Sequence, residues 1–394
     1  MSREPRIAGV NVVGPLRAES GVGEAARAVV AALDAARIPV LPVLPPETSV
    51  SRQGVRFGAV GVAEAAFPVT VLCLTAVETP GFAGAAGPSF FRGRHTIGLW
   101  WWEVSSFPEP LHPAFAHVDE VWAGSTHVAA ALAGPAASSG VPVTPVRIPV
   151  RRARTRRIRR AELGMPEGFV FLTVFGYYSG VARKNPLGAI EAFRRAFGPG
   201  EGASLVVKCI DEDAHPEEHA ALLAAAAEHP DVYVLPGYIS RDAMDALVQR
   251  SDAVVSLHRA EGFGFTPAEA MACAKPVIAT AYSGNLDYMT DDNSLLVPAG
   301  LVPIGAHGGP YPPDGEWAEP DLDIAARHMR RIVAEPEFGR RLGERAARDL
   351  AARFSTDAAG GIMRATMLPH ADAHRWARAR ARALALRLRR RNLG

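Results

Sequence analysis

The stretch 253–285 constrains the fold more than any other part of this chain. An apolar strand at 253–257 leads into a glycine-rich turn at 261–266 and a short helix, and a second apolar strand at 275–280 ends in another turn. Strand, glycine turn, helix and strand in direct succession are typical of a doubly wound parallel sheet. Ligands bind such sheets outside the carboxyl ends of the strands, so both turns are candidate binding elements.

The short helix carries its own start signal. Thr266 supplies an N-cap hydroxyl, Pro267 stands at the first helical position, and Glu269 follows three residues after the cap. The turn then presents free backbone N–H groups and a positive helix end, which together favour an anion. Glu261 and Glu269 flank this position. The alternative is structural: Glu269 only completes a capping box, and Glu261 is a solvated loop acid.

The N-terminal half opens in a similar way. A buried strand at 7–13, a loop containing Gly21, Val22 and Gly23, and a helix at 24–36 form a Rossmann-like start. The glycines allow backbone N–H groups to approach a phosphate closely. The full dinucleotide fingerprint is missing, and no acid stands in a strong ribose position, so an NAD enzyme is not favoured.

The segment 96–104 contains three consecutive tryptophans, at 100–102, followed by an acid, Glu103. Aromatic rings at the end of a strand bind sugar faces well, although tryptophan is also ordinary core filling. Alternation along a strand buries some of these rings and exposes others, and Trp102 is the one we expect to be accessible. Trp102 and Glu103 are therefore candidate sugar or acceptor contacts.

An arginine- and proline-rich stretch at 142–160 indicates a domain boundary, which we place after Arg152. A basic run can bind nucleic acid or anionic lipid, but a solvated linker is the simpler expectation. The net charge of +2 also argues against a bulk electrostatic partner such as nucleic acid.

The second half again alternates strands and helices, with strands at 169–175, 204–210 and 232–235. Arg183 and Lys184 lie on a loop after the first of these strands. A guanidinium beside an ammonium suits a diphosphate, and a salt bridge with Glu191 is the structural alternative. A helix after Pro186 should bury Ile190, Phe193 and Phe197 on one face.

Composition excludes several classes of protein. The 394 residues suffice for two or three domains, and the three cysteines are far apart, as in buried free thiols. No His, Cys or Asp cluster has metal-ligand spacing. Residues 1–6 lack an apolar core long enough for a signal peptide, so we expect none, and no apolar run approaches the length needed to span a bilayer. We expect a cytoplasmic protein, and peripheral membrane contact stays open for the basic linker and the tail.

Several separated motifs together resemble glycosyltransferase family 4, the retaining nucleotide-sugar transferases of GT-B fold. They are Glu261-x7-Glu269, Ser20-Gly-Val-Gly-Glu24, Arg183-Lys-Asn-Pro186 and the Trp102-Glu103 segment with its downstream strand at 118–125. The resemblance implies an α/β protein with two Rossmann-like doubly wound domains facing each other across a cleft. The domains would be 1–152 on the acceptor side and 153–373 on the nucleotide-sugar side, with a helix at about 374–394 crossing back.

The same resemblance implies roles for the site residues. Arg183 and Lys184 would stabilise the departing phosphate, and Glu261 would hold the donor sugar. The other donor-binding candidates are Gly21, Val22, Gly23, Tyr238, Ile239, Phe263, Gly264, Phe265, Thr266 and Glu269. Glu269 would hold the ribose, and the Cys209–Asp211 and Gly237–Ser240 segments would form the slot for the base. Many relatives carry a histidine where this chain has Trp102 and Glu103, a departure that affects sugar positioning.

The implied reaction moves a sugar from a UDP- or GDP-linked donor to a hydroxyl acceptor and needs neither a metal nor a further cofactor. The acceptor can be a glycan, a glycolipid or a secondary metabolite. Three alternatives stay open: an inactive homologue that only binds nucleotide sugars, a phosphorylase of the same fold, and a nicotinamide-dependent dehydrogenase.

Overall fold

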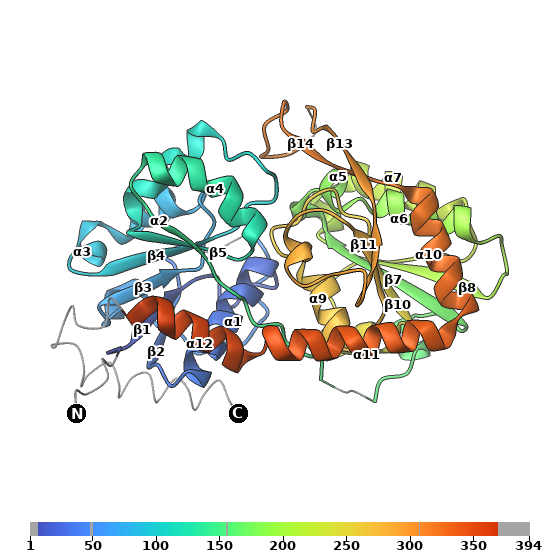
Figure 1. The fold of residues 1–394 in the computed structure, drawn as a ribbon, viewed down its shortest axis with the longest axis horizontal. Helices are drawn as coiled ribbons and strands as arrows, with labels where there is room; N and C mark the ends of the chain where they lie inside the picture. Colours follow the sequence, from blue (N-terminus) through green and yellow to red (C-terminus); the bar gives the residue numbers. More distant parts are fainter. Residues whose placement is uncertain (1–6, 48–49, 155–156, 307, 369–394) are drawn as a thin grey trace. The chain divides into compact units, whose positions relative to one another are not determined.

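The computed structural model describes residues 7–47, 50–154, 157–306 and 308–368. The chain forms two compact units, each built on its own sheet (Figure 1). Unit 1 contains Met1–Trp102, Ser106–Pro149 and Arg353–Gly394, whereas unit 2 contains Glu103–Ser105 and Val150–Ala352. The crossing at 149–150 lies close to the boundary expected after Arg152.

Unit 1 holds a six-stranded parallel sheet in the order β2-β1-β3-β4-β5-β6. Its strands are β1 (Val10–Val13), β2 (Val40–Val43), β3 (Val69–Leu72), β4 (His95–Trp100), β5 (Glu120–Ala123) and β6 (Val143–Pro145). Its α-helices are α1 (Gly21–Ala35), α2 (Thr79–Ala86), α3 (Pro88–Phe91), α4 (Thr126–Ser138) and α12 (Thr356–Met367), with 3-10 helices at Val62–Glu64 and Glu109–His117. Strands β1 to β3 are buried throughout, as a sheet covered on both faces requires.

The predicted glycine loop of unit 1 is in fact the first turn of α1. Ser20 caps this helix, and its hydroxyl oxygen accepts a hydrogen bond from the Gly23 N–H at 3.2 Å. A Cβ at position 23 would lie 2.5 Å from the Ala18 carbonyl oxygen, so only glycine fits there. Arg27 Nη1 donates to the same oxygen at 2.9 Å, and this fixes the loop before the helix. The N–H groups of Gly21 and Val22 thus belong to a helix N-terminus.

The prediction that strand alternation would expose a tryptophan is wrong. Strand β4 ends at Trp100, and the side chains of Trp100, Trp101 and Trp102 are all buried. Trp100 Nε1 donates to the Thr79 hydroxyl at 3.2 Å, and Trp102 Nε1 donates to the Ser106 carbonyl at 2.7 Å. The chain leaves the sheet before Trp102, so the two-residue period of a strand no longer governs its direction.

Unit 2 holds a second parallel sheet in the order β12-β11-β10-β7-β8-β9, and a separate antiparallel hairpin. Its strands are β7 (Phe169–Gly176), β8 (Ala203–Ile210), β9 (Val232–Leu235), β10 (Ala253–Ser256), β11 (Val277–Thr280), β12 (Leu295–Val297), β13 (Ala299–Pro303) and β14 (Glu316–Pro320). Its α-helices are α5 (Val181–Lys184), α6 (Pro186–Ala196), α7 (Pro216–Ala227), α8 (Arg241–Arg250), α9 (Phe265–Ala272), α10 (Leu322–Ala334) and α11 (Pro336–Arg353). Short 3-10 helices lie at Ala161–Leu163, Tyr177–Ser179, Glu212–Ala214 and Gly284–Asp287.

The expected apolar face of α6 is confirmed. Ile190, Phe193 and Phe197 are buried in the core of unit 2 together with Phe171 of β7. The hairpin β13–β14 falls in a region that the sequence left as loop. Both strands are only five residues long, and β13 has no buried residue, so no continuous apolar run marks the hairpin.

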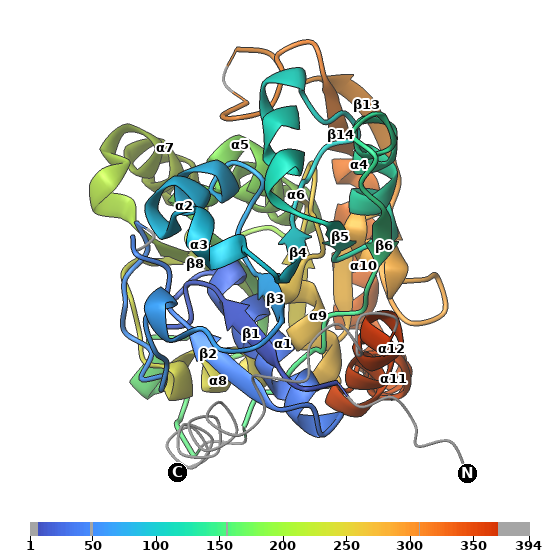
Figure 2. The ribbon, with the colours of Figure 1, turned by 90° about the vertical axis from the view of Figure 1, so that its left-hand side faces the viewer.

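The chain returns to unit 1 earlier than expected. Helix α12 lies beside α1 in both ribbon views (Figures 1 and 2), and a Cβ at Gly360 would collide with the carbonyl of Ala32. The small residue therefore permits the close approach of these helices. The sequence assigned this segment to the second domain, and the proposed crossing helix at 374–394 lies outside the described residues.

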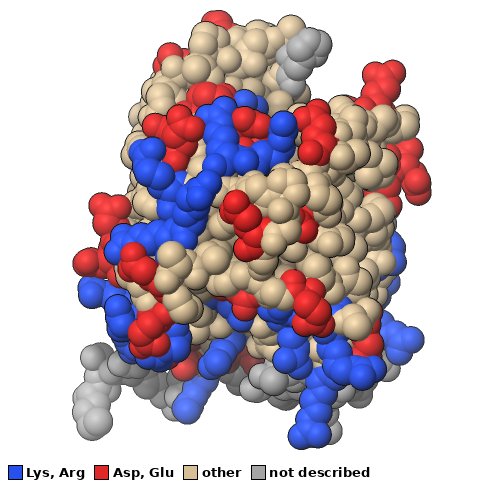
Figure 3. Space-filling view, turned by 90° about the vertical axis from the view of Figure 1, so that its right-hand side faces the viewer, with Lys and Arg blue, Asp and Glu red and all other residues tan. Residues whose placement is uncertain are grey.

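The arginine-rich linker is anchored on unit 2 and is not simply solvated. Arg160 Nη2 donates to Asp252 Oδ2 and to the Arg250 carbonyl, both at 2.7 Å. Arg250 Nε in turn donates to the Ile158 carbonyl at 2.9 Å. Figure 3 shows Lys and Arg side chains interspersed with Asp and Glu side chains on one face of the molecule. On unit 2, Arg195 and Asp323 form one ion pair at 3.0 Å.

Candidate active site

Arg183, Lys184 and Glu261 form a compact ionic cluster in unit 2. Helix α5, which carries the two cations, follows β7, and Glu261 follows β10, the strand that pairs with β7. Lys184 Nζ donates to Glu261 Oε1, and Arg183 Nη1 lies 3.3 Å from Glu261 Oε2. The loops meet because adjacent parallel strands end at the same edge of the sheet.

Backbone contacts lock the cluster in place. Arg183 donates from Nη1 to the Ala260 carbonyl at 2.8 Å and from Nε to the Ser179 carbonyl at 3.0 Å. Asn185 caps α6 by accepting from the Gly188 N–H at 3.1 Å, and its Nδ2 donates to the Leu257 carbonyl at 2.9 Å. Arg183 and Asn185 therefore fasten the two loops together, whereas the side chain of Lys184 is about one-fifth exposed.

The electrostatics of the cluster favour an ionised Glu261. Burial by itself would raise the pKa of this carboxyl, but the nearby Lys184 and Arg183 cations outweigh burial and hold the pKa at about 2. Burial also disfavours the charged form of Arg183, but Tyr311, Glu261 and Glu103 raise its pKa above the ordinary value. The carboxylate is thus an acceptor of hydrogen bonds at neutral pH and a poor proton donor.

We predict a specific acid sensitivity from this pKa. The ordinary carboxyl pKa is 4.5, so the stabilisation from Glu261 is fully present above pH 4.5 and is lost as the pH falls toward 2. Its size is about 3 kcal/mol, from about 1.4 kcal/mol per pKa unit. Glu261→Gln should therefore melt at a lower temperature than the wild type at pH 7. The difference between the two melting temperatures should shrink as the pH drops below 4.5. A melting-temperature difference that stays constant from pH 7 to pH 3 would contradict this pKa.

The second predicted turn contacts the first. The Glu261 N–H donates to the Ser283 hydroxyl at 2.8 Å, and the Gly284 N–H donates to the Glu261 carbonyl at 2.9 Å. A Cβ at position 284 would lie 2.5 Å from the Gly262 carbonyl carbon, so the two turns pack backbone to backbone. Glu261 is therefore positioned by a turn that lies more than twenty residues further along the chain.

The expected helix start at Thr266 is wrong. Helix α9 begins at Phe265, and its N-cap is Gly264, which has a φ of +86°. Tyr288 Oη donates to the Gly264 carbonyl at 2.6 Å and holds this left-handed turn. Glu269 does not complete a capping box, because its carboxylate accepts instead from Arg241 Nη2 at 2.7 Å.

Two residues near the cluster were not foreseen. His258 is fully buried, with ring nitrogens 3.0 Å from the Ser256 hydroxyl and 3.2 Å from Asn285 Oδ1, and burial lowers its pKa. Tyr311, in the loop between β13 and β14, donates to Glu103 Oε2 at 2.7 Å. The position of His258 just after a predicted strand was a sequence signal that could have indicated a site residue. No local sequence pattern indicates Tyr311.

The segments expected to form the base slot are linked to each other. Tyr238 Oη donates to Asp211 Oδ1 at 2.6 Å, and Lys208 Nζ donates to the carbonyls of Cys209 and Gly237. Lys208 is buried, and burial lowers its pKa. These contacts bring the end of β8 to the loop after β9, next to Ile239.

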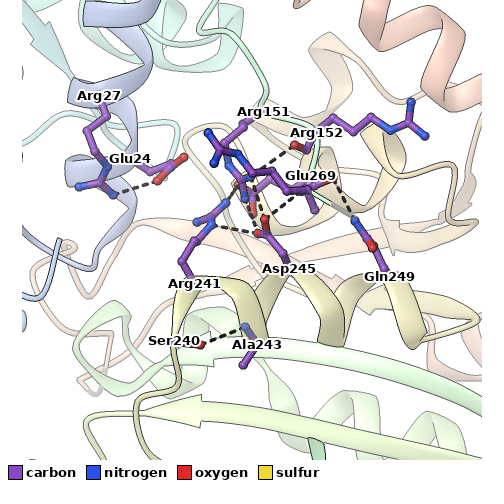
Figure 4. Close-up of polar contacts among 12 residues, drawn as sticks. Glu24, Arg27, Arg151, Arg152, Ser240, Arg241, Ala243, Asp245, Gln249 and Glu269 are labelled. Carbon is purple, nitrogen blue, oxygen red and sulfur yellow. Dashed lines mark hydrogen bonds and ion pairs between the residues drawn. The ribbon is translucent and has the colours of Figure 1, made fainter. Parts of the chain in front are cut away.

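The remaining candidates divide between the units. Gly21, Val22, Gly23 and Trp102 belong to unit 1, and the others belong to unit 2. Within unit 2, Glu269 lies in a second charged cluster with Arg151, Arg241 and Asp245 (Figure 4). Among the described residues, no group of three His, Cys, Asp or Glu side chains could hold a metal ion. No helix in the described part of the chain is long and apolar enough to cross a membrane.

Comparisons with known proteins bear on the family and the fold of this chain. Residues 160–349, which carry Arg183, Lys184, Glu261 and Glu269, match the family model described as glycosyl transferases group 1. The matched segment is 190 of the 394 residues, a little less than half of the chain. The chain is also 26% identical over 209 residues to the 2-deoxystreptamine N-acetyl-D-glucosaminyltransferase of Streptomyces fradiae. That match covers 53% of this chain and 44% of the relative, so the chain spans less than half the length of this relative.

Solved structures confirm the fold class of two Rossmann-like domains. Sucrose-phosphate synthase from Thermosynechococcus elongatus aligns with a TM-score of 0.67 at 17% identity, over 93% of this chain and 100% of that chain. Anabaena HepE, solved in complex with UDP-glucose, aligns with a TM-score of 0.65 at 14% identity. That alignment covers 91% of this chain and 99% of HepE. At these identities the likeness concerns the fold alone.

Proposed function

We propose that this glycosyltransferase is a retaining, metal-independent enzyme that moves a hexosyl group from a nucleoside-diphosphate sugar to a hydroxyl acceptor. The observation that carries the proposal is the Arg183–Lys184–Glu261 cluster at the carboxyl edge of the unit 2 sheet. Two cations suit the departing diphosphate, and an ionised carboxylate suits the sugar hydroxyls.

In the proposed reaction, the bond between the anomeric carbon and the β-phosphate oxygen breaks while the acceptor oxygen bonds to that carbon. The acceptor proton passes to the departing phosphate, so no protein base is needed. Negative charge grows on the phosphate, and Lys184 and Arg183 stabilise it, because buried cations interact strongly with charge that develops nearby. The N-terminus of α9, next to Phe263 and Gly264, adds a favourable dipole within unit 2. Gly21, Val22 and Gly23 stay candidate donor contacts by family resemblance.

The acid in this mechanism has a binding role. Glu261 is held ionised, so it accepts hydrogen bonds from the donor sugar and is unsuited to be the general acid of a glycosidase pair. Lys184 bonds to Glu261 here, and an arriving phosphate would compete for the same ammonium. Binding of the donor would then release Glu261 lone pairs toward the sugar.

Nucleotide binding is assigned to the remaining candidates of unit 2. Glu269 would accept from the ribose hydroxyls, Thr266 and Phe265 lie in the first turn of α9, and Tyr238 and Ile239 would line the base. The UDP-glucose complex of HepE supports a UDP-linked donor. The name of the Streptomyces relative supports an N-acetylhexosamine donor and a polyhydroxylated small-molecule acceptor. Glu103 is proposed as a contact to the sugar or acceptor, whereas Trp102 is buried and bonded to the Ser106 carbonyl and is not proposed as one. The free cysteines fit a cytoplasmic enzyme.

A nucleotide panel tests this proposal directly. The melting temperature is measured with UDP, GDP, UDP-glucose, UDP-N-acetylglucosamine, GDP-mannose and NAD, because a ligand stabilises the fold according to its affinity. We expect stabilisation by one nucleoside diphosphate and its sugars, with release of that diphosphate when an acceptor mixture is added. Stabilisation by NAD alone would overturn the proposal, and turnover that requires inorganic phosphate would favour the phosphorylase. Binding without turnover over a broad acceptor panel would favour an inactive homologue.

A further inference from the structure

Four charged side chains form a network that includes Glu269 of α9, and the mechanism above uses only Glu269. Arg151 and Arg241 supply two guanidinium groups, and Asp245 and Glu269 supply two carboxylates (Figure 4). Arg151 follows the point at which the chain enters unit 2, whereas Arg241 and Asp245 belong to α8. The four formal charges cancel, which indicates a built network and not an anion site.

Asp245 is the anchor of this network. Its side chain is only 3% exposed, and it accepts a two-pronged hydrogen bond from the Arg151 guanidinium. It also accepts from the Arg154 N–H at 2.9 Å and from Arg241 Nε at 3.0 Å. A carboxylate that accepts four donors has its hydrogen-bonding capacity filled. Its role is therefore to orient the two arginines.

Arg241 connects this anchor to Glu269. While its Nε bonds to Asp245, its Nη2 donates to Glu269 Oε1 at 2.7 Å. Arg151 Nη2 lies 4.0 Å from the same oxygen. The last torsion of a glutamate side chain is broad, so an unsupported carboxylate samples many orientations. A rigid guanidinium that is itself held in place selects one of them.

We propose that Arg241 is a positioning residue for nucleotide binding. Held by Asp245, it orients the Glu269 carboxylate to accept hydrogen bonds from the vicinal ribose hydroxyls of a nucleoside diphosphate. Arg151 supports the same carboxylate from the segment that joins the units. This inference rests on the proposed function, because it assigns the ribose to Glu269.

The test measures how strongly the protein distinguishes a nucleotide that has ribose hydroxyls from one that lacks them. Calorimetry gives the Kd of UDP, GDP and their 2′,3′-dideoxy counterparts for the wild type, Arg241→Gln and Arg241→Lys. The wild type should bind the preferred diphosphate about tenfold more tightly than its dideoxy form, as expected for hydrogen bonds to a charged group. In Arg241→Gln that ratio should fall to about twofold, with little change in the Kd of the dideoxy form, and Arg241→Lys should be intermediate.

Arg250→Gln is the matched control, because Arg250 lies at the other end of α8 and bonds to the linker carbonyl of Ile158. In this variant, the ratio of the Kd of the dideoxy nucleotide to the Kd of the ribose nucleotide should equal the wild-type ratio. Equal weakening of both nucleotide forms in Arg241→Gln means a merely structural role and overturns the inference. If the wild type binds a diphosphate with no preference for the ribose hydroxyls, the inference fails while the proposed function survives. If the wild type binds no nucleoside diphosphate, both fail.

Discussion

Lys184→Ala should lower kcat by about 10²- to 10³-fold, the loss expected when one preorganised charge-stabilising group is removed from an active site. In the free protein Lys184 is bound to Glu261, but the carboxylate keeps a second cation, Arg183, 3.3 Å away. The variant should therefore fold, and its Kd for the nucleoside diphosphate should rise less than its kcat falls. Initial rates and calorimetric titration of the same preparation separate the two effects.

Lys275→Ala is the matched control for this prediction. Lys275 also lies in unit 2, but its ammonium donates to the Ser251 carbonyl at 2.7 Å and takes no part in the cluster. Removing it should reduce stability and leave kcat within about twofold of the wild type, because no interaction with the transition state is lost. Equal loss of kcat in the two variants would mean that Lys184 has no special role in the reaction.

Gly284→Ala should destabilise unit 2 by about 3 kcal/mol, in the upper range for overpacking, and should abolish turnover. The added methyl group would lie 2.5 Å from the carbonyl carbon of Gly262, which is backbone and cannot rotate away. Relief requires the 261–264 loop to move, and this breaks the hydrogen bond from Gly284 N–H to the Glu261 carbonyl. Thermal melting, measured with UDP and without it, reports the loss of stability. Initial rates report the loss of turnover.

Gly300→Ala provides the comparison for Gly284→Ala. Gly300 lies in β13, and no heavy atom lies within 4 Å of the position that its Cβ would take. This substitution should change the free energy of unfolding by less than about 0.5 kcal/mol. If the two alanine variants melt at the same temperature, the close packing of the two turns is not what holds Glu261.

Some elements of the site followed from local pattern. The apolar runs of β7, β10 and β11 are short, bounded by glycine or polar turns, and separated by helices, so their placement in one parallel sheet was predictable. Because parallel strands end at one edge, the loops that carry Arg183 and Glu261 were expected to lie near each other. The apolar face of α6 was likewise readable from its period.

The errors came from places where a local signal competes with a distant contact. Thr266, Pro267 and Glu269 look like a capping box, but Tyr288 holds Gly264 in a left-handed conformation, and α9 starts two residues earlier, at Phe265. Trp102 lies past the end of its strand, where the two-residue period no longer applies. The sequence predicts a solvated linker, but Arg160 donates hydrogen bonds to Arg250 and Asp252, about ninety residues further along the chain.

The sequence by itself determined most strands of the two parallel sheets, the class of fold and the charged residues near the strand ends, because these depend on spacing and residue type. It did not determine the β13–β14 hairpin. Only the tertiary structure decided which charges pair with which. In the structure, Glu261 accepts a hydrogen bond from Lys184, and Glu269 accepts one from Arg241, whose side chain is held by Asp245. Such pairings depend on the direction in which each loop leaves the sheet, and contacts between residues far apart in the chain set that direction.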